Sequence, residues 1–150
     1  MFLTNLDIPY TDTHKAQRSG QPHEYIIPEL EALKDTPKQD KVIWPHRYNA
    51  DKQPDIAENL KSNFDVVITA KMGLSKSAYY REVASSKVIF SCALHENLGI
   101  SIMEAVLAGV IPVLPDRCSY AEMYPAEFLY PTNWTSSYEN YCSYKVQLVE

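Results

Sequence analysis

The chain has 150 residues, and its 14 Lys or Arg and 19 Asp or Glu residues give it a formal charge of −5. Its length suits a single hydrophobic core, and its 45% hydrophobic and 22% charged residues are typical of a globular protein, which excludes a disordered or collagen-like chain. The acidic balance argues against a nucleic-acid-binding domain, because such domains are usually basic.

The first 40 residues are polar and interrupted by prolines. They predict an irregular segment, residues 1–40, with a short strand at 25–27 and a short helix at 28–34. They lack the basic stretch and the long apolar core of a signal peptide, and no apolar run in the chain approaches the roughly 18 residues of a membrane span. We therefore expect a cytoplasmic protein without a membrane span.

Apolar runs and helical patterns then alternate over residues 41–131, and a tyrosine-rich tail with a helix at 136–149 follows over residues 132–150. The alternation predicts an α/β fold in which helices cover both faces of a mostly parallel sheet. Ile56, Leu60 and Phe64 recur at every fourth residue and predict a buried helical stripe. The predicted strands are 41–44, 65–69, 87–93 and 110–114, and the predicted helices between them are 54–64, 78–85 and 98–108.

Cysteine, histidine and glycine patterns exclude three kinds of site. The three cysteines are too scattered for a disulfide framework, and neither they nor the four histidines have metal-ligand spacing, so we expect no metal. The four glycines cannot be combined into a Walker loop or a dinucleotide fingerprint. Any nucleotide phosphate must therefore be bound by other groups.

Polar residues follow the predicted strands at the sheet edge where ligands of open α/β sheets bind. Arg47 and Lys52 come after the first strand, and together they could clamp a diphosphate. The alternative is two solvated surface cations. After the fourth strand, Ser119, Tyr120 and Glu122 could line the same crevice or simply begin an ordinary helix.

The turn after the third strand leads into the helix at 98–108. The free N–H groups at a helix start suit phosphate, and Gly99 allows close approach. Glu96 and Glu104 could accept hydrogen bonds from sugar or ribose hydroxyls. Glu104 in particular needs a partner, because it is the only charged residue in an apolar helix. The alternative is a Glu96 that stabilises the helix dipole and an exposed Glu104.

Residues 96–105 (ENLGISIMEA) resemble the E-x7-E motif of retaining GT-B glycosyltransferases of family 4. Arg47 and Lys52 match that family's Arg and Lys after the first strand of its C-terminal domain. Residues 44–47 (WPHR) and 124–130 (YPAEFLY) are closer still to its queuosine-tRNA mannosyltransferase branch. The resemblance covers residues 41–130.

The resemblance implies a single Rossmann-like domain, one half of a GT-B fold, that binds a GDP- or UDP-sugar and transfers a hexose with retention and without a metal or other cofactor. Asn97 and His46 replace glycines that are usual in the family, and the short span between the second and third strands implies a smaller sheet. The resemblance gives catalytic roles to Glu96, Arg47 and Lys52 and donor-binding roles to His46, Asn97, Leu98, Gly99, Glu104, Ser119 and Tyr120.

Residues 1–40 are too few for an acceptor-binding domain, so we expect this chain to act with a missing domain or a partner subunit. The acceptor is unidentified, and tRNA is an analogy only. The alternative is a non-catalytic interaction module derived from a glycosyltransferase, which the tyrosine-rich C-terminal region favours because tyrosine is enriched at interfaces. A receiver-type domain has less support, because no acidic cluster follows the first strand.

Overall fold

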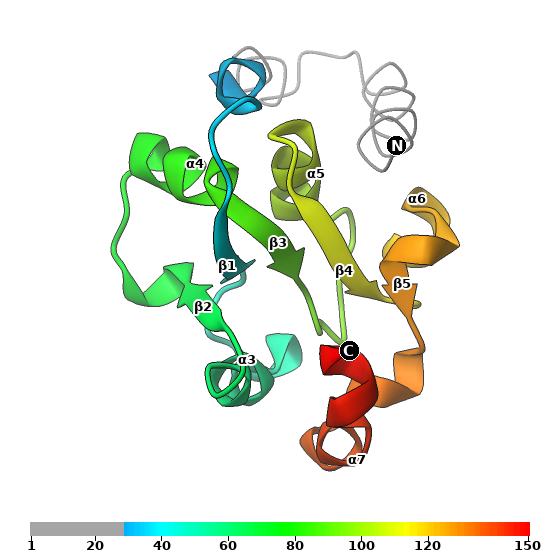
Figure 1. Ribbon diagram of the computed structural model, residues 1–150. Helices are drawn as coiled ribbons and strands as arrows, with labels where there is room; N and C mark the ends of the chain where they lie inside the picture. The colour runs from blue at the N-terminus through cyan, green and yellow to red at the C-terminus, as the bar shows by residue number, and fades with distance from the viewer. Residues whose placement is uncertain (1–28) are drawn as a thin grey trace.

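The computed structural model describes residues 29–150 (Figure 1). The strand expected at 25–27 and most of the expected irregular segment lie outside the described residues. Residues 29–33 are helical, in agreement with the short helix predicted at 28–34.

The strands form one five-stranded sheet in the order β2-β1-β3-β4-β5, and every neighbouring pair is parallel. The predicted α/β class with a mostly parallel sheet is confirmed. Two-residue β5 was not predicted, because a run this short has no periodicity to detect. The strands are β1 Gln39–Trp44, β2 Asp65–Ile68, β3 Ser86–Phe90, β4 Ile111–Pro115 and β5 Leu129–Tyr130.

The helices cover both faces of the sheet (Figure 1). One core cluster joins Ile43 and Ile89 of the sheet to α4 and α5, and the other joins Trp44 and Phe90 to α3 and α7. Adjacent residues of one strand thus serve opposite faces, as the pleat requires. The helices are α3 Pro54–Leu60, α4 Lys76–Ala84, α5 Ile100–Leu107, α6 Tyr120–Met123 and α7 Tyr138–Val149. Short 3-10 turns lie at η1 Ala50–Lys52, η2 Thr69–Lys71, η3 Ala126–Phe128 and η4 Thr132–Thr135.

Helix boundaries differ from the predictions where a local group ends or begins the helix. The helix α3 ends at Leu60, so the predicted stripe was wrong at Phe64, which is 40% exposed. The helix α4 begins earlier than predicted because Ser75 Oγ accepts a hydrogen bond from the Ala78 N–H at 3.2 Å. The helix α5 begins at Ile100 because Gly99 has a left-handed φ of 70°.

The C-terminal helix α7 packs against α3. Tyr141 is fully buried and donates a hydrogen bond to Asn59 Oδ1 at 2.9 Å. Phe90, Tyr130, Trp134 and Tyr144 stack in sequence between the sheet and α7. Residues 132–150 therefore contribute to the second core cluster. None of the helices within residues 29–150 combines the length and apolarity needed to cross a membrane.

Candidate functional site

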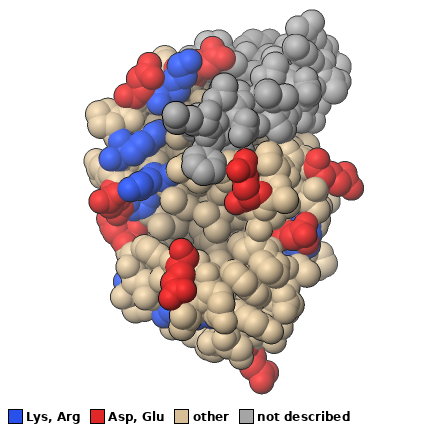
Figure 2. Space-filling model, turned by 45° about the vertical axis from the view of Figure 1, so that its right-hand side comes forward, with Lys and Arg blue, Asp and Glu red and all other residues tan. Residues whose placement is uncertain are grey.

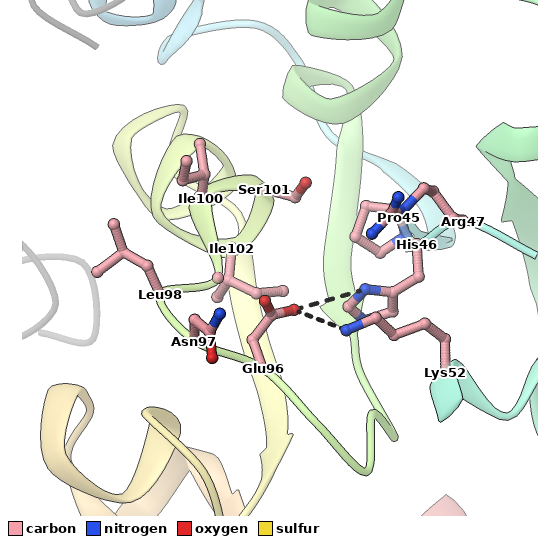
Figure 3. A pocket seen from close by; sticks show the side chains of 11 residues that line it. Pro45, His46, Arg47, Lys52, Glu96, Asn97, Leu98, Ile100, Ser101 and Ile102 are labelled. Carbon is pink, nitrogen blue, oxygen red and sulfur yellow. Dashed lines mark hydrogen bonds and ion pairs between the residues drawn. The ribbon is translucent and has the colours of Figure 1, made fainter. Parts of the chain in front are cut away.

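A pocket of about 330 Å³ opens where the loop after β1 meets the N-terminus of α5 (Figure 3). It brings together Arg47, Lys52 and Glu96, although Lys52 and Glu96 are 44 residues apart in the chain. Both loops follow the carboxyl ends of adjacent parallel strands, β1 and β3, which explains why they meet. The lining residues are Pro45, His46, Arg47, Lys52 and 96–102.

Two cations of different exposure lie at this pocket. Lys52 is only 9% exposed, its Nζ donates a hydrogen bond to the His95 carbonyl, and it lies 3.4 Å from Glu96 Oε2. Arg47 is exposed, and its guanidinium has no hydrogen-bond or ion-pair partner among residues 29–150. The structure therefore offers one cation held in place and one available to a ligand.

His46 forms one wall of the pocket and is only 7% exposed. Its Nε2 lies 2.8 Å from Ser91 Oγ, and its Nδ1 lies 4.0 Å from Glu96 Oε2. Burial, reinforced by the nearby Lys52 charge, lowers the pKa of His46 to about 4. The imidazole is therefore neutral near pH 7, and its proximity to Glu96 is not an ion pair.

The turn before α5 depends on Gly99. Its φ of 70° is a conformation that residues with a side chain rarely adopt, and a Cβ there would lie 3.0 Å from Tyr120 Cε1. This turn places Asn97 and Leu98 on the pocket lining, together with the first turn of α5, residues 100–102. The N–H groups of Ile100 and Ser101 precede the first helical hydrogen bonds, which the Ile102 and Met103 N–H groups donate to the Gly99 carbonyl.

Glu104 is not on the lining of this pocket. It lies one turn beyond Ser101 on α5, and burial raises the pKa of its carboxyl to about 7, although the charge of Lys76 on α4 lowers it. A neighbouring hollow of about 370 Å³ shares Pro45, His46 and Arg47 with the first pocket and reaches Lys76 and Tyr79. Glu104 therefore lies near this second hollow, and its predicted contact with a ribose remains a prediction.

Neither Ser119 nor Tyr120 lines the pocket. Tyr120 is completely buried, with its hydroxyl 3.1 Å from Ser91 Oγ and 3.5 Å from Glu96 Oε2. The Ser119 hydroxyl is buried and has no hydrogen-bond partner within the described part of the chain. Their predicted contact with a ligand also remains a prediction.

Sequence reasoning missed two residues that support the site, Ser91 and Arg117. Ser91 follows β3 within a predicted strand, where a small hydroxyl carries no distinctive signal. Arg117 donates hydrogen bonds to the carbonyls of Cys92 and Ala93 at 2.9 and 2.8 Å and to the Thr135 carbonyl at 3.1 Å. It therefore fixes the start of the loop that carries Glu96. Its only sequence signal is a charge beside a predicted strand end.

Comparisons with known proteins show a distant similarity to a glycosyltransferase. No family model matches the chain. Over 133 residues the chain is 27% identical to the tRNA-queuosine alpha-mannosyltransferase of Drosophila melanogaster. The chain is distantly related to a glycosyltransferase. The match includes 67% of this chain and 35% of the relative, so the chain spans about a third of that protein's length.

Within residues 29–150, no group of three or more His, Cys, Asp or Glu side chains could hold a metal ion.

Proposed function

We propose that this chain binds the nucleoside-diphosphate sugar donor of a retaining glycosyl transfer that needs no metal. The observation that carries the proposal is the convergence of Arg47, Lys52 and Glu96 on one pocket at the N-terminus of α5. The distant relation to a mannosyltransferase supports the same reaction class.

The cations suit a diphosphate. The exposed Arg47 guanidinium can contact two phosphate oxygens at once, and the buried Lys52 adds a fixed positive charge. The free N–H groups at the start of α5 add hydrogen-bond donors. Negative charge grows on the diphosphate as its bond to the sugar breaks, and these groups stabilise that charge in the role that Mg²⁺ has elsewhere.

The two hollows, which share His46 and Arg47 in their lining, suit the two ends of the donor. Glu96 accepts hydrogen bonds from sugar hydroxyls in the first pocket. The second hollow takes the nucleoside, with Glu104 accepting from the ribose hydroxyls. The diphosphate then lies between them, next to Arg47.

The relative's name refers to mannosyl transfer and to tRNA-queuosine. For this chain, a mannosyl donor and a tRNA acceptor are proposals. A GDP-linked hexose is the first donor to test. In Figure 2 the largest group of Lys and Arg side chains lies at the upper left of the visible face, next to Asp and Glu side chains, so that face offers no broad positive surface for RNA.

The interaction-module alternative loses most of its sequence support. Tyr120, Tyr124, Tyr130 and Tyr141 are all buried and contribute to the core. Tyrosines that pack inside the domain are not available to a partner. The enzyme-derived donor site therefore remains the stronger proposal.

Calorimetric titration in EDTA with GDP, GDP-mannose, UDP and UDP-glucose tests the proposal. We expect Arg47→Ala and Lys52→Ala each to weaken diphosphate binding about tenfold or more and to leave guanosine binding unchanged, because each removes a charge-assisted contact. Lys87→Ala is the matched control, since Lys87 lies on β3 far from the strand's carboxyl end and pairs with Asp40. Absence of binding by every nucleotide up to millimolar concentration, or equal losses for guanosine and GDP, would refute the donor site.

A further inference from the structure

Four polar side chains form a ring with one gap at the wall of the pocket. The Tyr120 hydroxyl lies 3.5 Å from Glu96 Oε2 and 3.1 Å from Ser91 Oγ, and His46 Nε2 lies 2.8 Å from the same Ser91 oxygen. His46 Nδ1 lies 4.0 Å from Glu96 Oε2, and this separation is the gap in the ring. Ser91 and Tyr120 are completely buried, whereas His46 and Glu96 line the pocket.

Ser91 restricts how protons are arranged in this ring. The Ala93 N–H already donates to Ser91 Oγ at 3.2 Å. A hydroxyl has one proton and two lone pairs, so Ser91 accepts from one of its two side-chain partners, His46 and Tyr120, and donates to the other. Only two proton orders satisfy every buried group.

In the first order, His46 Nε2–H donates to Ser91, Ser91 donates to Tyr120, and Tyr120 donates to Glu96. In the second order, Tyr120 donates to Ser91, Ser91 donates to His46 Nε2, and the His46 Nδ1–H faces Glu96. The two orders correspond to the two neutral tautomers of His46. Each leaves one contact of Glu96 Oε2 without a proton.

The space between His46 Nδ1 and Glu96 Oε2 suits one hydroxyl group. Their separation of 4.0 Å is too long for a direct hydrogen bond, but an oxygen about 2.8 Å from both atoms bridges it. Such a hydroxyl accepts from Nδ1–H and donates to the carboxylate. Only the second proton order provides Nδ1–H, so a bound hydroxyl selects that order.

We propose that Ser91 is a positioning residue that holds His46 in the Nδ1–H tautomer, so that His46 and Glu96 together bind one hydroxyl of the donor sugar. The inference rests on the proposed function, because it assigns the sugar to this pocket. Tyr120 makes the competing proton order available in the unliganded pocket. Ser91 and Tyr120 therefore have opposite effects on sugar binding, although they are hydrogen-bonded neighbours.

The test compares a sugar nucleotide with its free diphosphate, using GDP-mannose with GDP and UDP-glucose with UDP. Ser91→Ala removes the donor to His46 Nε2, and we expect it to weaken sugar-nucleotide binding about three- to tenfold relative to the free diphosphate. In Tyr120→Phe, His46 is the only remaining side-chain acceptor for the Ser91 proton. We expect the affinity of this variant for the sugar nucleotide, relative to the free diphosphate, to equal or exceed that of the wild type. A structural role would instead make both variants weaken both ligands.

Ser86→Ala is the matched control, because Ser86 is a completely buried serine at the other end of β3. Nitrogen-15 NMR of the wild-type chain with the sugar nucleotide provides a second measurement that needs no variant, and it should show His46 protonated at Nδ1. Protonation at Nε2 in that complex, or an equal loss of both ligands in Ser91→Ala, overturns the inference. If either result is found while the wild type binds free diphosphates, the inference fails and the proposed function stands. If the wild type binds no nucleotide, the inference and the proposed function both fail.

Discussion

Glu104 is the only charged side chain of α5, and its burial makes the stability of the domain depend on pH. Burial raises the pKa of its carboxyl from 4.5 to about 7. Between these values the folded chain retains a proton that the unfolded chain has lost, so stability falls as the pH rises through this window and is level above it. Glu104→Gln keeps the shape of the side chain and cannot ionise, so it should remove this loss.

The size of the effect follows from the shift in pKa. A shift of this size corresponds to a loss of about 3 kcal/mol at most in the free energy of unfolding. Solvent screening of a half-buried carboxyl reduces this loss to about 1–2 kcal/mol. In a domain of this length each kcal/mol moves the melting temperature by roughly 3 °C. We therefore expect Glu104→Gln to melt about 3–6 °C above the wild type at pH 8 and close to it at pH 4.5.

Circular dichroism melts of the chain without nucleotide, at pH 4.5, 6 and 8, measure this difference. Glu122→Gln is the matched control, because Glu122 is exposed on α6 and its substitution should change the melting temperature little at any of the three pH values. A gain for Glu104→Gln that is the same at pH 4.5 and pH 8 would show that the carboxyl does not titrate as its burial requires.

Three further substitutions test how the site is held in place. Gly99→Ala should cost about 1–2 kcal/mol of stability and weaken nucleotide binding, because the residue has a φ of 70° and a Cβ would press on Tyr120. Lys38→Met should cost about 1–3 kcal/mol of stability, because the Lys38 ammonium donates to the Ala84 carbonyl at the end of α4 and to the Ala108 carbonyl just after α5. Arg117→Lys should cost about 2 kcal/mol, because lysine cannot reproduce the planar set of hydrogen bonds to separate carbonyls.

Urea unfolding measures all three losses, and each has a matched control. Gly73→Ala has the same backbone strain at φ 59° but no atom within 4 Å of the new Cβ, so the difference from Gly99→Ala isolates the contact with Tyr120. Lys87→Met and Arg81→Lys alter exposed cations and should change stability by less than about 0.5 kcal/mol. Losses no larger than those of the controls would contradict the structural roles of Gly99, Lys38 and Arg117.

Most of the fold could be predicted, because a strand covered on both faces must be apolar along its whole length. The runs at 42–44 (VIW) and 111–114 (IPVL) show this pattern directly, and both lie in strands of the sheet. The errors occur where a single group competes with the pattern. Phe64 fits the helical period of α3, but the chain turns after Leu60 to enter β2, and Phe64 is exposed.

The pocket-lining residues could be predicted in part for a similar reason. Arg47 and Glu96 lie in the loops that follow β1 and β3, and in a parallel sheet the carboxyl ends of neighbouring strands meet at one edge. Residue type and order were therefore enough to bring them to one pocket. Glu104 shows the limit, since helical spacing from Glu96 does not reveal that its carboxyl lies beside α4.

The sequence by itself determined which segments are strands and helices and which polar residues reach the ligand-binding edge, because hydrophobic periodicity and strand ends are local features. Hydrogen-bond partners are not local. Ser91 and Tyr120 are 29 residues apart, and Ser91 and His46 are 45 apart. These side chains come into contact because β1, β3 and β4 are neighbours in the sheet and because α6 turns Tyr120 toward Ser91. The ring around Glu96, and with it the tautomer of His46, therefore follows only from the packed tertiary structure.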